Sequence, residues 1–178
     1  QEGETYRFVN KVVGGVIPKE FIPAVDQGIR DALLSGPLGG YELINVQATL
    51  KDGSFHEVDS SDLAFRIAGS LSVKEGITKD NSELFEPMMK VEVLVPDEYL
   101  GDIVGNLTSR RCKISGMETR QGSTAVEAVC PLSEMFGYAT DLRSRTQGRG
   151  TFTMQFYRYD KVSAAIQEQI LGRYNYWF

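Results

Sequence analysis

The first half of the chain switches between two hydrophobic periods. Residues 6–13 and 41–50 show the alternation typical of strands. Residues 18–35 and 60–75 repeat apolar side chains every three to four positions, which is typical of helices. The predicted order is strand, helix, strand, helix. The second helix is expected to bury one apolar face, formed by Ala64, Ile67, Ala68 and Leu71.

The second half begins near Pro87, where a helical pattern gives way to strand alternation. Strands are predicted before residue 96, over residues 112–117 and 124–130, and from residue 151. Helices are predicted to begin at the two prolines Pro96 and Pro131. The resulting order, β-α-β-β-α-β, is the ferredoxin-like arrangement, in which two helices cover one face of a four-stranded antiparallel sheet.

These patterns predict an α+β protein with two small domains. A β-α-β-α domain is expected over residues 1–85 and a ferredoxin-like domain over residues 86–160. The remainder, residues 161–178, is expected to form a short helix and a tail.

Composition narrows the classes of function. The chain has 178 residues and a net charge of -5, so a protein that wraps bare nucleic acid is disfavoured and any RNA contact must be local. Its two cysteines, Cys112 and Cys130, are interpreted as buried thiols in preference to a disulfide. A zinc site is disfavoured because the chain has a single histidine and no Cys/His cluster.

Signals for catalysis are weak. The phosphate-binding pattern GxxxxGK[ST] and the dinucleotide pattern GxGxxG are both absent. His56 lies near Asp52, Glu57 and Asp59 and could be imagined as a general base, but no nucleophile or metal constellation accompanies it. From the residues alone, His56 is interpreted as a solvated loop residue.

Basic residues gather at the ends of the two helices of the second half. A cation near a helix C-terminus stabilises the helix by about 0.3–1 kcal/mol, which accounts for one arginine at each end. The first cluster is Arg110, Arg111 and Lys113, and the second is Arg143, Arg145 and Arg149. Phosphate contact is slightly favoured for the second cluster. For the first, phosphate contact and helix stabilisation are evenly balanced. Base stacking on the sheet is disfavoured, because Phe152 and Phe156 are expected in the core.

Four segments resemble elongation factor G. Residues 131–144 read PLSEMFGYATDLRS and residues 146–150 read TQGRG, and both are similar to the last domain of that family. Residues 8–25 read FVNKVVGGVIPKEFIPAV and residues 52–61 read DGSFHEVDSS, similar to its fourth domain. The resemblance runs from about residue 6 to residue 162.

The resemblance implies a function that composition does not. Elongation factor G is a cytoplasmic, monomeric translational GTPase that moves tRNA and mRNA through the ribosome. Its nucleotide site, with GTP and Mg²⁺, belongs to N-terminal domains absent from this sequence, so no cofactor and no catalysis are expected here. The implied partners are 16S-type and 23S-type rRNA and the tRNA–mRNA duplex of the A site, with no membrane. The implied RNA-binding residues are Ser54, His56, Glu57, Asp59 and Ser60, with Gly137, Tyr138, Asp141, Arg143 and Arg149 in the last domain.

Other interpretations remain open at this point. The chain could belong to a paralogue that acts in ribosome recycling or in tetracycline-resistance ribosomal protection, although the His56 loop favours the translocase. It could also be a free-standing ferredoxin-like binding domain. The fourth domain is expected to lack its beginning, which would leave a sheet edge unpaired. The aromatic ending over residues 173–178 is unusual for the family.

Overall fold

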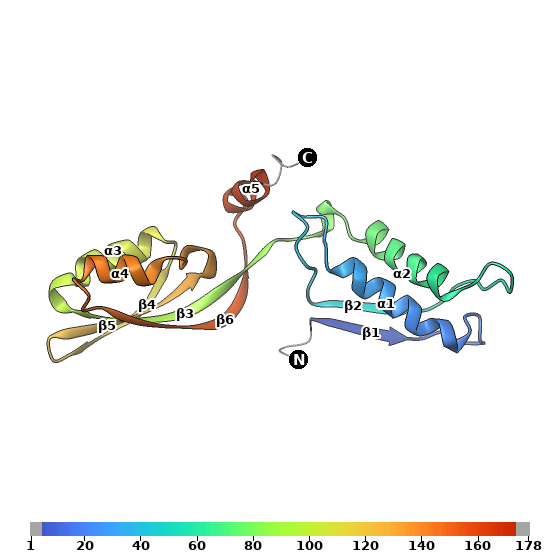
Figure 1. Ribbon diagram of the computed structural model, residues 1–178, viewed down its shortest axis with the longest axis horizontal. Coiled ribbons are helices and arrows are strands. Elements are labelled where there is room, and N and C mark those ends of the chain that lie inside the picture. The colour runs from blue at the N-terminus through green and yellow to red at the C-terminus, as the bar shows by residue number, and fades with distance from the viewer. Residues whose placement is uncertain (1–4, 174–178) are drawn as a thin grey trace. The chain divides into compact units, whose positions relative to one another are not determined.

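A computed structural model describes residues 5–173, which divide into two compact units (Figure 1). The first unit contains the described residues up to Glu83 and those from Ala165 onward, and the second runs from Leu84 to Ala164. The sequence placed this division two residues later and kept the C-terminal segment separate. Here α5, Ala164–Gly172, belongs mainly to the first unit, where the side chain of Leu171 lies beside Gly39.

The first unit has the predicted order of elements. These are β1 (Tyr6–Asn10), α1 (Ile22–Leu33), β2 (Val46–Leu50) and α2 (Asp62–Gly76), with 3-10 turns at Lys19–Phe21 and Lys79–Asn81. The two strands pair in parallel, so both strands end at the same edge of the sheet.

Both strands of the first unit are shorter than predicted. β1 stops at Asn10, whose side-chain Oδ1 accepts a hydrogen bond from the amide of Val12 at 3.0 Å. The segment before β2 is held elsewhere, because the Leu43 amide donates to the Leu33 carbonyl at 2.8 Å and Asn45 takes a left-handed φ of 58°. At Val12 and Leu43, hydrogen bonds to Asn10 and Leu33 therefore take the place of pairing between the two strands.

The contact between α1 and α2 overturns the predicted apolar face of α2. The buried residues of α2 are Phe65 and Gly69, whereas Ile67 and Leu71 are each 49% exposed. Glycines set this geometry: a Cβ on Gly28 would lie 1.9 Å from the Arg66 carbonyl oxygen, and one on Gly69 would lie 2.5 Å from that of Val25. Close approach of the two backbones turns the face of α2 with Phe65 and Gly69 inward and its predicted apolar stripe outward.

The second unit confirms the ferredoxin-like prediction. Its elements are β3 (Phe85–Pro96), α3 (Leu100–Ser109), β4 (Lys113–Arg120), β5 (Ser123–Pro131), α4 (Tyr138–Arg145) and β6 (Thr151–Lys161). The strand order is β4-β5-β3-β6, antiparallel throughout, with both helices on one face (Figure 1). The helices begin later than predicted, because 3-10 turns at Asp97–Tyr99 and Leu132–Glu134 come first.

A disulfide corrects the interpretation of the two cysteines as free thiols. Lys113 of β4 is paired with Val129 of β5, so the residues beside that pair, Cys112 and Cys130, face each other with their Cα atoms 4.2 Å apart. Their sulfur atoms are bonded. The register of two antiparallel strands, which cysteine spacing does not reveal, brings the thiols together.

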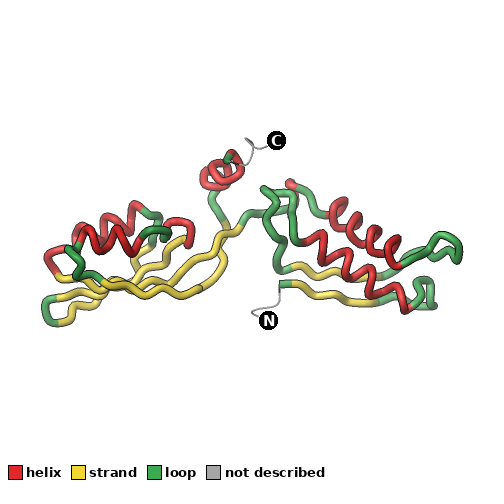
Figure 2. Tube along the Cα trace, in the orientation of Figure 1, coloured by secondary structure: helices red, strands yellow, loops and turns green. Residues whose placement is uncertain are grey.

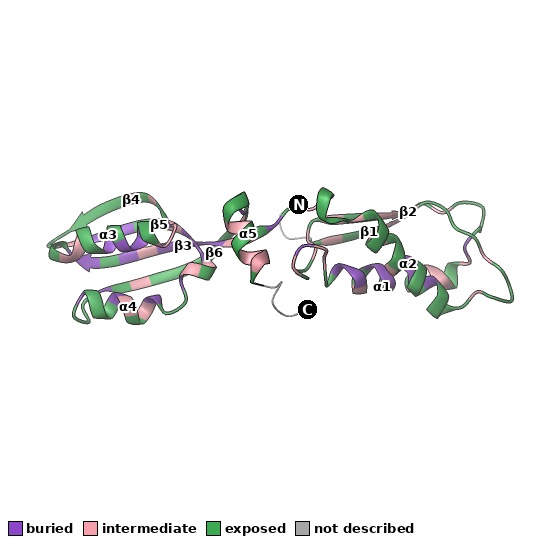
Figure 3. Cartoon of the chain, turned by 90° about the horizontal axis from the view of Figure 1, so that it is seen from above, coloured by how far each residue is buried: buried purple, intermediate pink, exposed green. Residues whose placement is uncertain are grey.

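The edge strand β6 is largely exposed, as Figure 3 shows. Phe152 packs against the ring of Tyr138 with centroids 5.0 Å apart, as expected for a core residue. Phe156 was expected in the core as well, but it is 56% exposed, and its ring lies 5.3 Å from that of Tyr159 on the same edge strand. No helix within residues 5–173 is long and apolar enough to cross a membrane.

The glycine contact predicts a specific sensitivity of the first unit. Gly28→Ala should lower its free energy of unfolding by about 1–3 kcal/mol, because the added methyl group must push two helices apart. Thermal and urea unfolding of the purified chain measure this change.

Gly105→Ala in α3 is the matched control, since a Cβ there meets no atom within 4 Å. It should leave stability unchanged or raise it by up to about 1 kcal/mol. Equal effects of the two substitutions would contradict the close helix contact.

Candidate functional site

The loop between β2 and α2, residues 51–61, is organised around the main chain of His56. The His56 amide donates to Ser60 Oγ at 2.9 Å, and the His56 carbonyl accepts from the amides of Asp59 and Ser60 at 3.2 and 2.9 Å. Ser61 then caps α2 by accepting a hydrogen bond from the Ala64 amide. The backbone is therefore fixed while the imidazole of His56 is exposed.

A single aromatic side chain anchors this loop to the body of the first unit. Phe55 is half-buried, and its ring lies 5.8 Å from that of Phe21, which stacks in turn on Phe65 at 4.9 Å. His56 is the next residue and consequently lies outside this cluster. The loop therefore presents the polar side chain of His56 beside an anchored residue, Phe55.

The five residues that the sequence singled out in this loop fall into two groups. Ser54, His56, Glu57 and Asp59 are exposed and available to a partner. Ser60 is half-buried, and its hydroxyl is engaged by the His56 amide, so it positions the loop. Among the described residues, no three His, Cys, Asp or Glu side chains gather where they could hold a metal ion.

A second loop, residues 11–19, lies against the first and was not singled out by the sequence. The Lys11 amide donates to the Leu50 carbonyl at 2.8 Å, and the buried side chain of Ile17 lies beneath Gly53. Figure 2 shows both loops in green at the same end of the first unit. We call residues 11–19 and 51–61 together the tip. The strand-helix-strand order could have indicated that the two loops are neighbours, because the loops that follow parallel strands leave the sheet at the same end.

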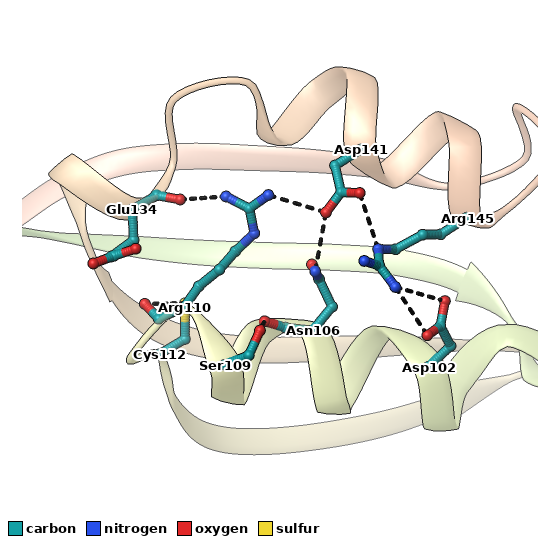
Figure 4. A network of polar contacts seen from close by, with 8 residues as sticks. All are labelled: Asp102, Asn106, Ser109, Arg110, Cys112, Glu134, Asp141 and Arg145. Atoms are coloured by element: carbon teal, nitrogen blue, oxygen red, sulfur yellow. Dashed lines mark hydrogen bonds and ion pairs between the residues drawn. The ribbon is translucent and has the colours of Figure 1, made fainter.

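In the second unit, Asp141 joins α3 to α4 (Figure 4). Its carboxylate accepts hydrogen bonds from Asn106 Nδ2 at 2.9 Å, Arg110 Nη2 at 3.0 Å and Arg145 Nε at 3.0 Å. Arg145 also reaches Asp102 at 3.0 Å. The hydrogen bond from Arg110, with those from Arg145 and Asn106, holds the pKa of Asp141 below its usual value against the opposing effect of partial burial. Asp141 is thus engaged internally.

The first basic cluster is engaged internally too. Arg111 binds the Glu86 carboxylate with both Nη atoms, at 2.7 and 3.0 Å, and Glu134 through Nε at 3.0 Å. These bonds, chiefly those to Glu86, raise the pKa of Arg111 above its usual value. Arg110 donates to the backbone carbonyl of Glu134 as well as to Asp141. Both arginines tie the turn after α3 to the segment before α4. Lys113 is exposed, and no partner engages it within residues 5–173.

The second basic cluster is only partly free. Arg145 is paired as described, and Arg149 pairs with Glu98 and lies over the Tyr99 ring, 5.8 Å from its centroid. Arg143 is exposed and has no partner in the described part of the chain. It is the member of this cluster most available to a phosphate.

Gly137 and Tyr138 act within the fold. Gly137 precedes α4 with a φ of 76°, a conformation that glycine adopts without steric cost. The ring of Tyr138 is fully buried, and this burial raises the pKa of its hydroxyl to about 12. The family signature in α4 therefore mixes folding residues with exposed cations.

Comparisons with known proteins decide the family. The family model described as elongation factor G, domain IV, matches residues 1–81, and that described as elongation factor G C-terminus matches residues 83–170. The chain belongs to the elongation factor G family. A crystal structure from Thermus thermophilus is similar at 36% identity and a TM-score of 0.86. The match covers 97% of this chain and 26% of the Thermus chain, so this chain spans about a quarter of that protein.

In this elongation factor G chain, the Asp141 network should contribute to stability. Asp141→Ala should cost the second unit about 1–3 kcal/mol, because it leaves partly buried donors of Arg110 and Asn106 without an acceptor. Asp102→Ala is the control: its carboxylate is 53% exposed, so the loss should stay within about 0.5 kcal/mol. Calorimetry of the three proteins tests the ranking, and equal losses would refute it.

The same network predicts an acid-sensitive second unit. A carboxyl group whose pKa is lowered by folding stabilises the fold above its unfolded value, about 3.9, and loses that contribution as the pH falls through the folded value. The unfolding temperature of the second unit should therefore fall below about pH 4. In Asp141→Asn the fall should be smaller. A variant as acid-sensitive as the wild type would contradict the role of Asp141.

Proposed function

We propose that the chain is the ribosome-binding, C-terminal part of an elongation factor G that promotes GTP-dependent movement of tRNA and mRNA. The observation that carries the proposal is the match to domain IV and then to the C-terminus of this family, in order and over nearly the whole chain. The nucleotide site, with GTP and Mg²⁺, would belong to a region outside these 178 residues. The factor would act in the cytoplasm as a monomer.

The first unit would reach the decoding site of the small subunit, where the tip meets the tRNA–mRNA duplex in the A site. Support comes from the geometry of the His56 loop: its main chain is fixed by three hydrogen bonds, and Ser54, His56 and Glu57 are exposed. Such a loop can occupy a position and offer polar contacts to the sugars and base edges of an RNA minor groove. It contributes no bond-making chemistry.

The second unit would contact the GTPase-associated rRNA of the large subunit. Its exposed, unpaired cations Arg143 and Lys113 support this assignment, and the half-exposed Arg149 could exchange Glu98 for a phosphate. Because few cations are free, this docking would rest on a small number of contacts. On its own the chain is expected to bind the ribosome weakly, since it lacks the avidity of the other domains.

His56→Ala in the intact factor should slow translocation about tenfold while GTP hydrolysis continues. Losing one or two polar contacts made during movement costs about 1.4 kcal/mol, which corresponds to that factor in rate. Single-turnover translocation of tRNA, measured beside phosphate release, separates the two steps.

Lys79→Ala provides the control, because Lys79 is exposed in the turn after α2, beyond the C-terminal end of that helix. It should translocate at the wild-type rate. If His56→Ala does so as well, the proposed role of the loop is wrong.

A further inference from the structure

The His56 loop, residues 51–61, carries too little positive charge for a surface that binds RNA. Its exposed ionisable side chains include the carboxylates of Asp52, Glu57 and Asp59, and Lys51 is the one cation between residues 51 and 61. An RNA duplex presents phosphates on both sides of its minor groove. This loop alone would be repelled by them, so another element must supply positive charge.

The neighbouring loop has the chemistry that the His56 loop lacks. Lys11 and Lys19 are exposed at its two ends, and Lys51 follows β2 beside it. None of these three lysines has an ion-pair partner within residues 5–173. That sets them apart from Arg110, Arg111 and Arg145 of the second unit, whose charges are already engaged.

The backbone between these lysines is open to close approach. Gly14 and Gly15 take left-handed φ values of 70° and 69°, and a Cβ on either residue would meet no atom within 4 Å. In the described structure no hydrogen bond engages their amides. Exposed amides in a glycine turn can donate to phosphate oxygens. Val13 beside them is 78% exposed and offers an apolar contact to a ribose ring.

The two loops are held together tightly enough to act on one ligand. The Lys11 amide is bonded to the Leu50 carbonyl at the root of the His56 loop, and Ile17 packs under Gly53 within that loop. A third contact joins the rings of Phe21 and Phe55. The lysines therefore lie at a defined place beside His56.

We infer that residues 11–19, together with Lys51, form the phosphate-binding half of the tip. In this arrangement Lys11, Lys19 and Lys51 contact the RNA backbone, while Ser54 and His56 face the groove. The inference rests on the proposed function and adds the element that supplies its affinity for RNA. The ligand is the sugar–phosphate backbone of the RNA duplex, so binding should depend on salt through counterion release.

The test is the salt dependence of binding between the 178-residue chain and small ribosomal subunits carrying mRNA and A-site tRNA. Lys11→Ala/Lys19→Ala should lower the slope of log K against log salt by about 1.8, and weaken binding about sixtyfold at roughly 0.1 M salt. Lys51→Ala should lower the slope by about 0.9. All three side chains are exposed, so the melting temperatures should stay at the wild-type value.

Lys74→Ala/Lys79→Ala is the matched control. It removes the same charge from exposed lysines at the C-terminal end of α2 and the turn beyond it. This variant should keep the wild-type affinity and slope. Binding by Lys11→Ala/Lys19→Ala that is as tight and as salt-dependent as the wild type would overturn the inference. So would equal losses in both double variants, because net charge would then suffice.

Failure of the proposed function gives a different result. If the wild-type chain does not bind these ribosomal subunits at any salt concentration, the proposed function is wrong and the inference fails with it. If the wild type binds, and Lys11→Ala/Lys19→Ala binds with the same affinity and the same salt dependence, the inference fails alone.

Discussion

The parallel pairing of β1 with β2 is the constraint on which the candidate site depends. Five residue pairs, from Tyr6 with Val46 to Asn10 with Leu50, align the two strands so that both end at the same edge. The loops that follow must then lie side by side, although about 40 residues separate them in the sequence. Antiparallel pairing would place one loop at each end of the unit. The helices stabilise this arrangement through Phe65 and the glycine contacts between α1 and α2.

In the second unit, arginines at the helix ends form internal ion pairs. Its arginines at the helix ends lie within hydrogen-bonding distance of carboxylates on neighbouring segments, as with Arg111 and Glu86 or Arg145 and Asp102. These pairs join α3, α4 and the start of β3, and they neutralise charge that could otherwise attract RNA. An acidic chain with a net charge of -5 can still dock on a ribosome, because docking needs a few free cations at defined places. Arg143 and the lysines of the tip meet that condition.

Sequence patterns predicted the order of all the main elements, because each carries its own hydrophobic period. They failed where tertiary contacts choose between options that are equal locally. The apolar stripe of α2 that includes Ile67 and Leu71 is a good helical face, yet Gly69 brings the opposite side against α1. Likewise, spacing could not show that Cys112 faces Cys130, since the register of β4 with β5 decides it.

At the candidate site, too, the sequence revealed some features and only the structure revealed others. Resemblance to elongation factor G located the His56 loop, and the structure shows that its main chain is fixed and its side chains exposed. The loop at residues 11–19 lies within the segment 8–25 that resembles the family, but none of its residues was singled out as part of a site. Ion pairing was also invisible in the sequence, so Arg143 could not be told from Arg145.

The central claim, that both loops of the tip meet the same RNA, can be tested by hydroxyl radicals generated from tethered iron. Val13 and Val58 are 78% and 94% exposed, one in each loop, and each can be replaced by a cysteine that carries the iron chelate. On protein bound to ribosomes that carry mRNA and A-site tRNA, Val13→Cys and Val58→Cys should cleave overlapping nucleotides of the tRNA–mRNA duplex. Lys79→Cys, beyond the C-terminal end of α2, should not cleave there. Cleavage from one loop alone, or from neither, would contradict the account.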